Sequence, residues 1–235
     1  MAARRKSSVE GGKPAIMPGA VRELFDEPVR GPARQALADG AVLLRGFVLD
    51  EGEALLHAVR QVAASSPFRR MITPGGYTMS AAMTNCGRAG WVTDRKGYRY
   101  TSIDPEAGKP WPDLPEIFVD LAGRAAAEAG FAGFAPDACL INCYEPGARL
   151  SLHQDRNERD LTAPIVSVSL GLPAVFLFGG EQRSDRPSRW RLQHGDVAVW
   201  GGAARLAFHG VAPLADGEHP LTGRQRINLT LRKAL

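Results

Sequence analysis

Short apolar runs alternate with turn residues through the second half of the chain, from about residue 136 onward. Residues 165–170 show the pattern best, since aliphatic residues at even positions would share one face of a strand and the serines at 167 and 169 the other. Strands this short, without helices between them, favour a jelly roll or a sandwich. We expect eight of them, at about 138–144, 149–153, 165–170, 174–178, 188–192, 196–200, 206–210 and 224–232.

The first half of the chain mixes helical and extended patterns. Ala41–Leu49 is apolar almost throughout and predicts a buried strand, whereas the spacing of Glu53–Ala64 predicts an amphipathic helix. Leu114–Gly130 predicts a second helix, because Pro115 suits a first turn and Gly130 a C-terminal end. The expected fold class is therefore α+β, mainly β, with helices ahead of a double-stranded β-helix (jelly-roll) core.

Composition suggests how the chain is divided. Residues 1–15 carry positive charge with no apolar segment after them, which excludes a secretory signal and predicts a disordered tail. Residues 16–235 are expected to form one domain, with the strand-rich core at about 136–235. Residues from 66 to about 110 are rich in Gly, Pro, Thr, Tyr and Trp, and predict hairpins and long loops, where binding residues tend to lie.

Bulk properties limit the functional classes. A chain of 235 residues with 44% hydrophobic content can form one well-packed domain, and no apolar run approaches the roughly 20 residues of a membrane span. A net charge of +4 allows contact with a polyanion without requiring it. The three cysteines form no CxxC pair, which predicts a reduced, cytoplasmic protein with Cys139 and Cys143 in its core.

The first candidate chemistry is a metal site. In a strand, residues i and i+2 point the same way, so His153 and Asp155 can reach one ion. For the third ligand we choose His209, which ends an apolar run; three other histidines lie in helix, turn or loop positions, namely His57, His194 and His219. Two histidines and one carboxylate leave an open face on Fe(II) for a co-substrate and O₂. An isolated HxD pair, however, is more often a chance pattern.

The last predicted strand adds a candidate co-substrate site. Within 224–232 the even positions are polar, three of them arginines, and positions 227, 229 and 231 are aliphatic. An ordinary half-exposed strand would show the same alternation. An arginine fork also pairs bidentately with carboxylates, of which 2-oxoglutarate carries two. Asn142 and Tyr144 share a face of an earlier predicted strand and could complete such a pocket.

Longer motifs are more specific than these pairs. The chain contains, in order, YTMSAAMTNCG, GWVTDRKGYRY, IDPEAGKPWP, NCYEPGARLSLHQD, APIVSVSLGLPAVFLFGG, HGDVAVWGG and RINLTLR. Together they resemble the bacterial AlkB proteins, a family of Fe(II)- and 2-oxoglutarate-dependent dioxygenases. The resemblance covers nearly everything from about Leu43 to the C-terminus.

The resemblance implies a role for each matched residue. It implies iron ligation by His153, Asp155 and His209. It implies 2-oxoglutarate binding, with O₂ as the second co-substrate, by five residues: Asn142, Tyr144, Asn228, Arg232 and, for the far carboxylate, Arg226. It implies a nucleotide-recognition lid at about 66–110 and substrate contacts by Trp91, Tyr98, Asn157, Arg183 and Met83. Without the family, Trp91 and Tyr98 would be read as ordinary packing beneath loops.

The resemblance also implies an activity. It is the oxidative demethylation, as direct-reversal repair, of N-alkylated bases such as 1-methyladenine and 3-methylcytosine in DNA, preferably single-stranded, with release of formaldehyde, succinate and CO₂. A monomer is expected. Duplex DNA and RNA stay open as partners, and two alternatives stay open for the function: an RNA or tRNA demethylase with the same chemistry, and a catalytically silent jelly-roll binding module.

One position departs from the family pattern. Where that pattern has Asp two residues after the metal aspartate, this chain has Asn157. An Asn carbonyl can accept a hydrogen bond but offers no negative charge to a cationic lesion. We therefore hypothesise a weaker preference for charged methyl lesions and a broader substrate range.

Overall fold

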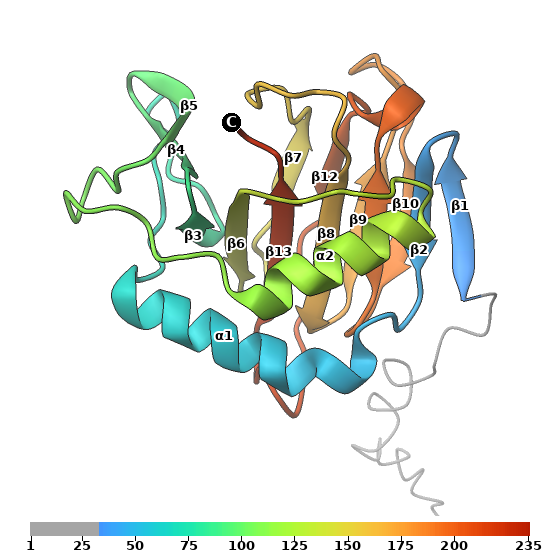
Figure 1. Cartoon of the computed structure of the whole chain (residues 1–235), viewed down its shortest axis with the longest axis horizontal. Coiled ribbons are helices and arrows are strands. Elements are labelled where there is room, and N and C mark those ends of the chain that lie inside the picture. The colour runs from blue at the N-terminus through green and yellow to red at the C-terminus, as the bar shows by residue number, and fades with distance from the viewer. Residues whose placement is uncertain (1–32) are drawn as a thin grey trace, which may run out of the picture. The chain divides into compact units, whose positions relative to one another are not determined.

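The computed structural model describes residues 33–235, so the predicted tail at 1–15 and the predicted domain start at residue 16 lie outside the described residues. The described part is mainly antiparallel strands with two α-helices, α1 (Gly52–Ser65) and α2 (Glu116–Glu128) (Figure 1). Short 3₁₀ turns occupy Leu49–Glu51 and Gly202–Ala204. The strands are β1 (Arg34–Ala38), β2 (Ala41–Leu44), β3 (Ala82–Gly87), β4 (Gly90–Asp94), β5 (Gly97–Thr101), β6 (Ala138–Tyr144), β7 (Leu150–His153), β8 (Ile165–Gly171), β9 (Ala174–Phe178), β10 (Ser188–Leu192), β11 (Val197–Trp200), β12 (His209–Val211) and β13 (Arg226–Arg232).

The strands form two main sheets and a separate hairpin. The major sheet has the order β1-β2-β11-β8-β13-β6-β3, and the minor sheet has the order β10-β9-β12-β7. Strands β4 and β5 pair only with each other among the described strands. Strand neighbours that are distant in sequence and all antiparallel are typical of a jelly roll. This confirms the predicted mainly β fold with a jelly-roll core.

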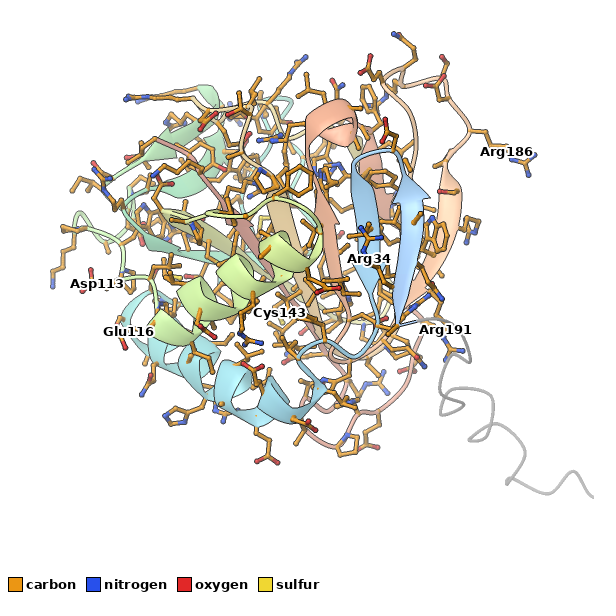
Figure 2. The ribbon with its side chains drawn as sticks, turned by 45° about the vertical axis from the view of Figure 1, so that its right-hand side comes forward. Arg34, Asp113, Glu116, Cys143, Arg186 and Arg191 are labelled. Carbon is orange, nitrogen blue, oxygen red and sulfur yellow. The ribbon has the colours of Figure 1, made fainter. Side chains whose placement is uncertain are left out.

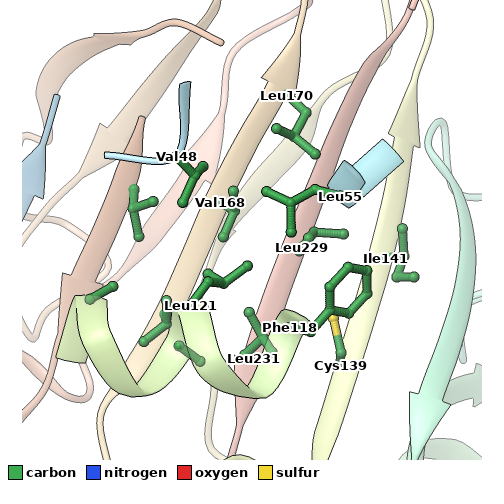
Figure 3. Packing of buried hydrophobic residues seen from close by; sticks show 14 of the residues in the cluster. Val48, Leu55, Phe118, Leu121, Cys139, Ile141, Val168, Leu170, Leu229 and Leu231 are labelled. Atoms are coloured by element: carbon green, nitrogen blue, oxygen red, sulfur yellow. The ribbon is translucent and has the colours of Figure 1, made fainter. Parts of the chain in front are cut away.

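The helices cover one face of the major sheet, as Figure 1 shows. Phe118 and Leu121 of α2 pack with Leu55 of α1 against aliphatic residues of the sheet, among them Val168 and Leu229 (Figure 3). Fully burying one such side chain stabilises the fold by about 1.5–3 kcal/mol. Because the aliphatic positions of β8 and β13 face the helices, the alternate positions of these strands face the minor sheet. The polar positions predicted from the sequence are thereby turned toward the space between the sheets.

The free cysteines lie in the core, as predicted. Cys139 and Cys143 belong to the same buried cluster as the two helices, and Figure 2 marks Cys143 beside them. Cys86 is also buried, and none of the three forms a disulfide in the described part of the chain. In residues 33–235 neither α-helix combines the length and apolarity needed to cross a lipid bilayer.

The strand predictions contained four errors, namely three wrong boundaries and one missed strand. The strand expected at Ala41–Leu49 ends at Leu44, because the chain turns there and enters a 3₁₀ turn. Strand β1 was missed, since its alternating exposure carries little apolar signal. The strand expected at 206–210 begins only at His209, where pairing with β7 and β9 starts.

The fourth error concerns the last strand, which was predicted to begin at residue 224. Arg224 lies outside β13, and its exposed side chain pairs with Asp216 at 2.9 Å. All residues of β13 are buried, so the ordinary half-exposed strand is excluded. A strand between β6 and β8, covered on both faces, must bury its polar side chains as well.

The turn at His194 allows a pH-dependence prediction. The Nδ1 atom of His194 accepts a hydrogen bond from the Gly171 backbone N–H at 3.0 Å. Burial, followed by the neighbouring His219, lowers the pKa of His194, while Asp196 opposes this. A lowered folded-state pKa means that this contribution to stability is present above the ordinary value of about 6.5 and is lost as pH falls.

We expect His194→Asn to weaken this acid sensitivity, since an amide oxygen can accept the same hydrogen bond and does not titrate. Urea denaturation at about pH 7.5 and at about pH 5.5 gives the free energy of unfolding at each pH. Between these two pH values this free energy should fall further for the unmodified protein than for His194→Asn. The same substitution at the exposed His57 of α1 is the control, and an equal effect at both positions would contradict the assignment.

Candidate metal centre

A cavity of about 900 Å³ lies between the two sheets. It is lined by β6, β8 and β13 of the major sheet, by β7, β9 and β12 of the minor sheet, and by the β4–β5 hairpin at one end. Every residue singled out from the sequence as a metal, co-substrate or substrate contact lines this one cavity. The structure therefore brings together residues from Met83 to Arg232 that are far apart along the chain.

The predicted metal ligands meet at one wall of the cavity. His153 ends β7 and His209 begins β12, and the two residues are direct partners in the antiparallel pairing of these strands. Their ring centroids are 4.4 Å apart. Asp155 follows β7 by two residues, and the candidate ligand atoms of all three residues lie within 4.8 Å of one another. Within residues 33–235, these three residues form the group of His, Cys, Asp or Glu side chains that is close enough together to share a metal ion.

Backbone carbonyls orient both imidazoles toward this point. His153 Nδ1 lies 2.9 Å from the Ser151 carbonyl, and His209 Nδ1 lies 3.0 Å from the Ala207 carbonyl. A carbonyl only accepts, so each Nδ1 carries the proton and each Nε2 keeps a free lone pair. The Nε2 atoms lie 3.7 Å and 3.6 Å from the two carboxylate oxygens of Asp155. Burial, then the closeness of the His209 ring, which disfavours a positive charge on both imidazoles, lowers the pKa of His153 to about 4, and this keeps His153 neutral near pH 7.

The third candidate ligand, Asp155, is held as an anion by an arginine. Burial by itself raises the pKa of Asp155, but the charge of Arg232 and contacts with His209 outweigh it and lower this pKa well below the usual range. Arg232 donates from Nε at 3.0 Å and from Nη2 at 2.7 Å, both to Oδ2. The Oδ1 atom is left to face His153. Two neutral imidazole nitrogens and one carboxylate oxygen on one side of a cavity fit an Fe(II) ion with open positions.

Deeper in the cavity lies a buried cation with unpaired donors. The Arg226 side chain is fully buried, donates from Nη2 to Ser169 Oγ at 2.9 Å, and stands 5.1 Å from the centre of the Tyr144 ring. Its Nε and Nη1 atoms have no partner, and neither does the Tyr144 hydroxyl. Burial lowers the pKa of Arg226, as expected for a charge without a counter-ion. Buried donors left unpaired are costly, so this pocket fits an anionic ligand such as a carboxylate.

The neighbouring amides complete a polar wall. Asn142 donates to the Asn228 side-chain oxygen at 3.2 Å, and Asn228 donates in turn to Ser167 Oγ at 2.9 Å. The Asn142 side-chain oxygen has no partner and lines the cavity. The predicted co-substrate residues therefore occupy one continuous surface, except that Arg232 already pairs with Asp155. Arg232 lies at the metal end of this surface and Arg226 lies in its interior.

An aromatic pair occupies the end of the cavity formed by the β4–β5 hairpin. Trp91 and Tyr98 stack with ring centroids 5.6 Å apart and an interplanar angle of 19°. The Trp91 indole N–H donates to the Asn157 side-chain oxygen at 3.3 Å. Arg183 donates to the Leu152 carbonyl at 2.8 Å, and Met83 is buried in the lining. A planar group could stack against this pair while a substituent on it reaches toward the metal ligands.

Sequence reasoning missed two residues, Trp200 in the cavity wall and Glu158 next to the candidate ligand Asp155. Trp200 is buried beside His209, with ring centroids 4.8 Å apart, and its indole N–H has no partner. Glu158 is buried three residues after Asp155 and contacts Arg205 and Arg232. The apolar neighbours of Trp200 gave no sign of a polar role, and Glu158 stands in a run of charges that reads as a solvated loop. To recognise these two residues from the sequence, one would have to know that Glu158 is buried and that the Trp200 indole faces a cavity.

The fold and the site together define a metal-dependent oxygenase with a jelly-roll core. Residues 40–232 match the 2OG-Fe(II) oxygenase superfamily. The alpha-ketoglutarate-dependent dioxygenase AlkB of Escherichia coli K12 is 59% identical to this chain over 203 residues, which cover 86% of this chain and 94% of that protein. The chain therefore belongs to the AlkB family of Fe(II)- and 2-oxoglutarate-dependent dioxygenases, as the sequence motifs predicted.

Two further relatives are more distant. The tRNA demethylase abh1 of Schizosaccharomyces pombe is 36% identical over 157 residues, which cover 61% of this chain and 52% of that protein. The solved structure of OsALKBH1 superimposes with a TM-score of 0.75 at 30% identity, and the match covers 85% of this chain and 99% of that chain. The fold is thus shared across members of the family with quite different sequences.

Proposed function

We propose that this dioxygenase removes methyl groups by oxidation from the bases of nucleic acid. The observation that carries the proposal is the single cavity that joins the candidate metal ligands, the unpaired Arg226 and the stacked Trp91–Tyr98 pair. A base removed from its stack loses its neighbours, and aromatic rings can replace them. The relative abh1, whose name states demethylation of tRNA, supports this class of substrate.

Each part of the cavity has a role in this proposal. His153, Asp155 and His209 would hold iron, and Arg226 would bind the far carboxylate of 2-oxoglutarate. Once bound, the two would supply the O₂-dependent hydroxylation of an N-methyl group, with formaldehyde, succinate and CO₂ as the products. The Trp91 ring orients the base, and the apolar and aromatic lining excludes water from the reacting carbon.

The preferred substrate in this proposal is alkylated single-stranded DNA that carries 1-methyladenine or 3-methylcytosine. These bases are cationic and cannot pair, which lowers the energetic cost of extruding them from a strand. The net charge of +4 supports binding to a polyanion. Duplex DNA and RNA are the alternative substrates, and the tRNA demethylase among the relatives favours testing RNA beside DNA. We further propose that the protein acts in the cytoplasm, which three unpaired buried cysteines support. We also propose that it acts as a monomer.

Formaldehyde release tests the proposal directly. Matched oligonucleotides would carry 3-methylcytosine in single-stranded DNA, duplex DNA and RNA, each with Fe(II), 2-oxoglutarate and O₂. We expect release from single-stranded DNA, and none from the His153→Ala variant. Faster release from RNA would favour the RNA demethylase, whereas no succinate with any substrate would favour a silent binding module.

Asn157 provides a prediction about lesion preference. It lines the cavity and already accepts the Trp91 N–H, but it carries no charge toward a cationic base. A carboxylate at this position would strengthen a hydrogen bond to such a base by about 1 kcal/mol. We therefore expect Asn157→Asp to raise the kcat/KM ratio of 3-methylcytosine over neutral etheno adducts by about fivefold.

The control is a charge change of the same sign outside the cavity. Gln61→Glu adds one negative charge on the exposed face of α1 and should leave the substrate ratio unchanged. If Asn157→Asp also leaves the ratio unchanged, Asn157 does not set the preference between charged and neutral lesions.

A further inference from the structure

Two consecutive side chains connect the metal-ligand segment with the β4–β5 hairpin. Asn157 accepts the indole N–H of Trp91 at 3.3 Å, and Glu158 accepts the hydroxyl of Tyr100 at 2.7 Å. Trp91 and Tyr100 are direct cross-strand partners in the hairpin. Side chains of such partners lie on the same face of a two-stranded sheet, so one face of the hairpin contacts the segment that carries Asp155.

The second of these contacts is part of a buried ionic network. The Glu158 side chain is 1% exposed and lies 3.2 Å from Arg205 Nη2 and 3.5 Å from Arg232 Nε. Arg205 is also buried and donates to the backbone carbonyl of Asp155 at 2.7 Å. The buried carboxylate of Glu158 thus has three partners, of which only Tyr100 belongs to the hairpin. Buried networks of this kind fix geometry because each group left unpaired is costly.

Arg232 connects this network to the metal-ligand carboxylate. Its guanidinium donates twice to Asp155 Oδ2 and faces Glu158 from the same Nε atom. A continuous path therefore runs from Tyr100 through Glu158 and Arg232 to Asp155. At the other end of the path, Tyr100 lies on β5 two residues after Tyr98, which stacks on Trp91. A displacement of the hairpin would change the hydrogen bonding of the network that orients Asp155.

We propose that Tyr100 and Glu158 are positioning residues that couple the nucleotide end of the cavity to the metal end. The hydroxyl of Tyr100 and the carboxylate of Glu158 hold the hairpin in the position that Asp155 requires to keep its Oδ1 toward His153 and the other candidate ligand atoms. Coupling between two sites is reciprocal, so each ligand strengthens the binding of the other by the same factor. This inference rests on the proposed function, because it assigns a nucleotide to the hairpin end.

A binding cycle without turnover measures the coupling. Mn(II) replaces Fe(II), and fluorescence anisotropy gives the Kd of a single-stranded oligonucleotide with 3-methylcytosine, first alone and then with Mn(II) and 2-oxoglutarate. We expect the two ligands to tighten oligonucleotide binding about tenfold in the unmodified protein. In Tyr100→Phe the two ligands should tighten oligonucleotide binding by only about twofold or less. The Kd measured without Mn(II) and 2-oxoglutarate should stay within about twofold of that of the unmodified protein.

Thr101→Val is the matched control, because it removes a hydroxyl from the next residue of the same strand. That hydroxyl donates to the Ile103 carbonyl and touches no part of the network. The thermal midpoint of each variant without ligands shows whether folding is intact. Glu158→Gln is the second variant; it can still accept from Tyr100 but lacks the charge that faces Arg205 and Arg232, and should also lower the factor.

The results separate this inference from the proposed function. The inference is overturned if Mn(II) and 2-oxoglutarate still tighten oligonucleotide binding tenfold in Tyr100→Phe. It is also overturned if Thr101→Val reduces this tightening as much as Tyr100→Phe does, or if the unmodified protein shows no tightening. In each of these cases formaldehyde release from the same oligonucleotide by the Fe(II)-loaded protein would leave the proposed function standing. No binding of the oligonucleotide together with no formaldehyde release would reject both.

Discussion

Arg226→Met should weaken the use of 2-oxoglutarate strongly and at the same time make the ligand-free protein more stable. The guanidinium of Arg226 is buried with two nitrogen atoms unpaired, beside the unpaired hydroxyl of Tyr144. Removing one partner of a buried charge pair costs about 2–5 kcal/mol of binding, so the KM for 2-oxoglutarate should rise by at least about thirtyfold. Methionine fills much of the same volume and adds no unpaired donor, so the free energy of unfolding should increase by about 1–3 kcal/mol.

Two measurements check this prediction. Succinate release as a function of 2-oxoglutarate concentration gives the KM, and urea denaturation of the ligand-free protein gives the free energy of unfolding. Mn(II) with 2-oxoglutarate should raise the Tm of the unmodified protein but not that of the variant. Arg224→Met is the control, because Arg224 is exposed and lies outside β13. A normal KM together with a lower stability would show that Arg226 is a structural residue.

Asp155→Asn should remove both metal binding and activity while weakening the fold. An amide is a poor substitute for an anionic metal ligand, and loss of even an outer contact costs about 10–100-fold in affinity, so we expect a loss of at least about a hundredfold. Buried Arg232 would then lose the carboxylate oxygen to which it donates two hydrogen bonds, and would keep the Glu158 carboxylate at 3.5 Å from its Nε. Breaking a buried pair in this way destabilises a protein by about 3–5 kcal/mol.

A double variant separates the two effects. Asp155→Asn combined with Arg232→Met also removes the buried cation that has lost its closest carboxylate, so it should recover much of the stability and none of the metal binding. Calorimetric titration with Mn(II) and urea denaturation measure the two quantities. Asp160→Asn, in the loop that follows, should change metal affinity little. Metal affinity close to that of the unmodified protein in Asp155→Asn would exclude Asp155 as a ligand.

The sequence predicted those elements whose signal is local. Strands 138–144, 174–178 and 188–192 have the predicted bounds, because a period of two in apolar residues depends only on neighbouring positions. For the same reason the sequence correctly predicted which positions of β8 and β13 share the aliphatic face of the strand. These are the even positions in β8 and the odd positions in β13. The limits of β2 and β12 were wrong because the end of a short strand depends on where its partner strand ends.

For the candidate site, too, some features could be predicted from the sequence and others depended on the fold. The spacing of His153 and Asp155, the polar positions of β13 and the family motifs are properties of the sequence, and they were sufficient to predict an Fe(II)- and 2-oxoglutarate-dependent dioxygenase of the AlkB family. Nothing local shows that His209 would pair across from His153, or that Arg226 would be buried with unpaired donors.

Tertiary structure alone decided these contacts, and with them the network from Tyr100 through Glu158 to Asp155. The reason is physical. Which face of a strand a side chain occupies follows from the backbone of that strand, but its partners and its exposure to water follow from the packing of elements that are far apart in the chain. Burial and long-range pairing turned ordinary polar residues of this sequence into a candidate metal centre, a pocket with unpaired donors and a network of contacts between them.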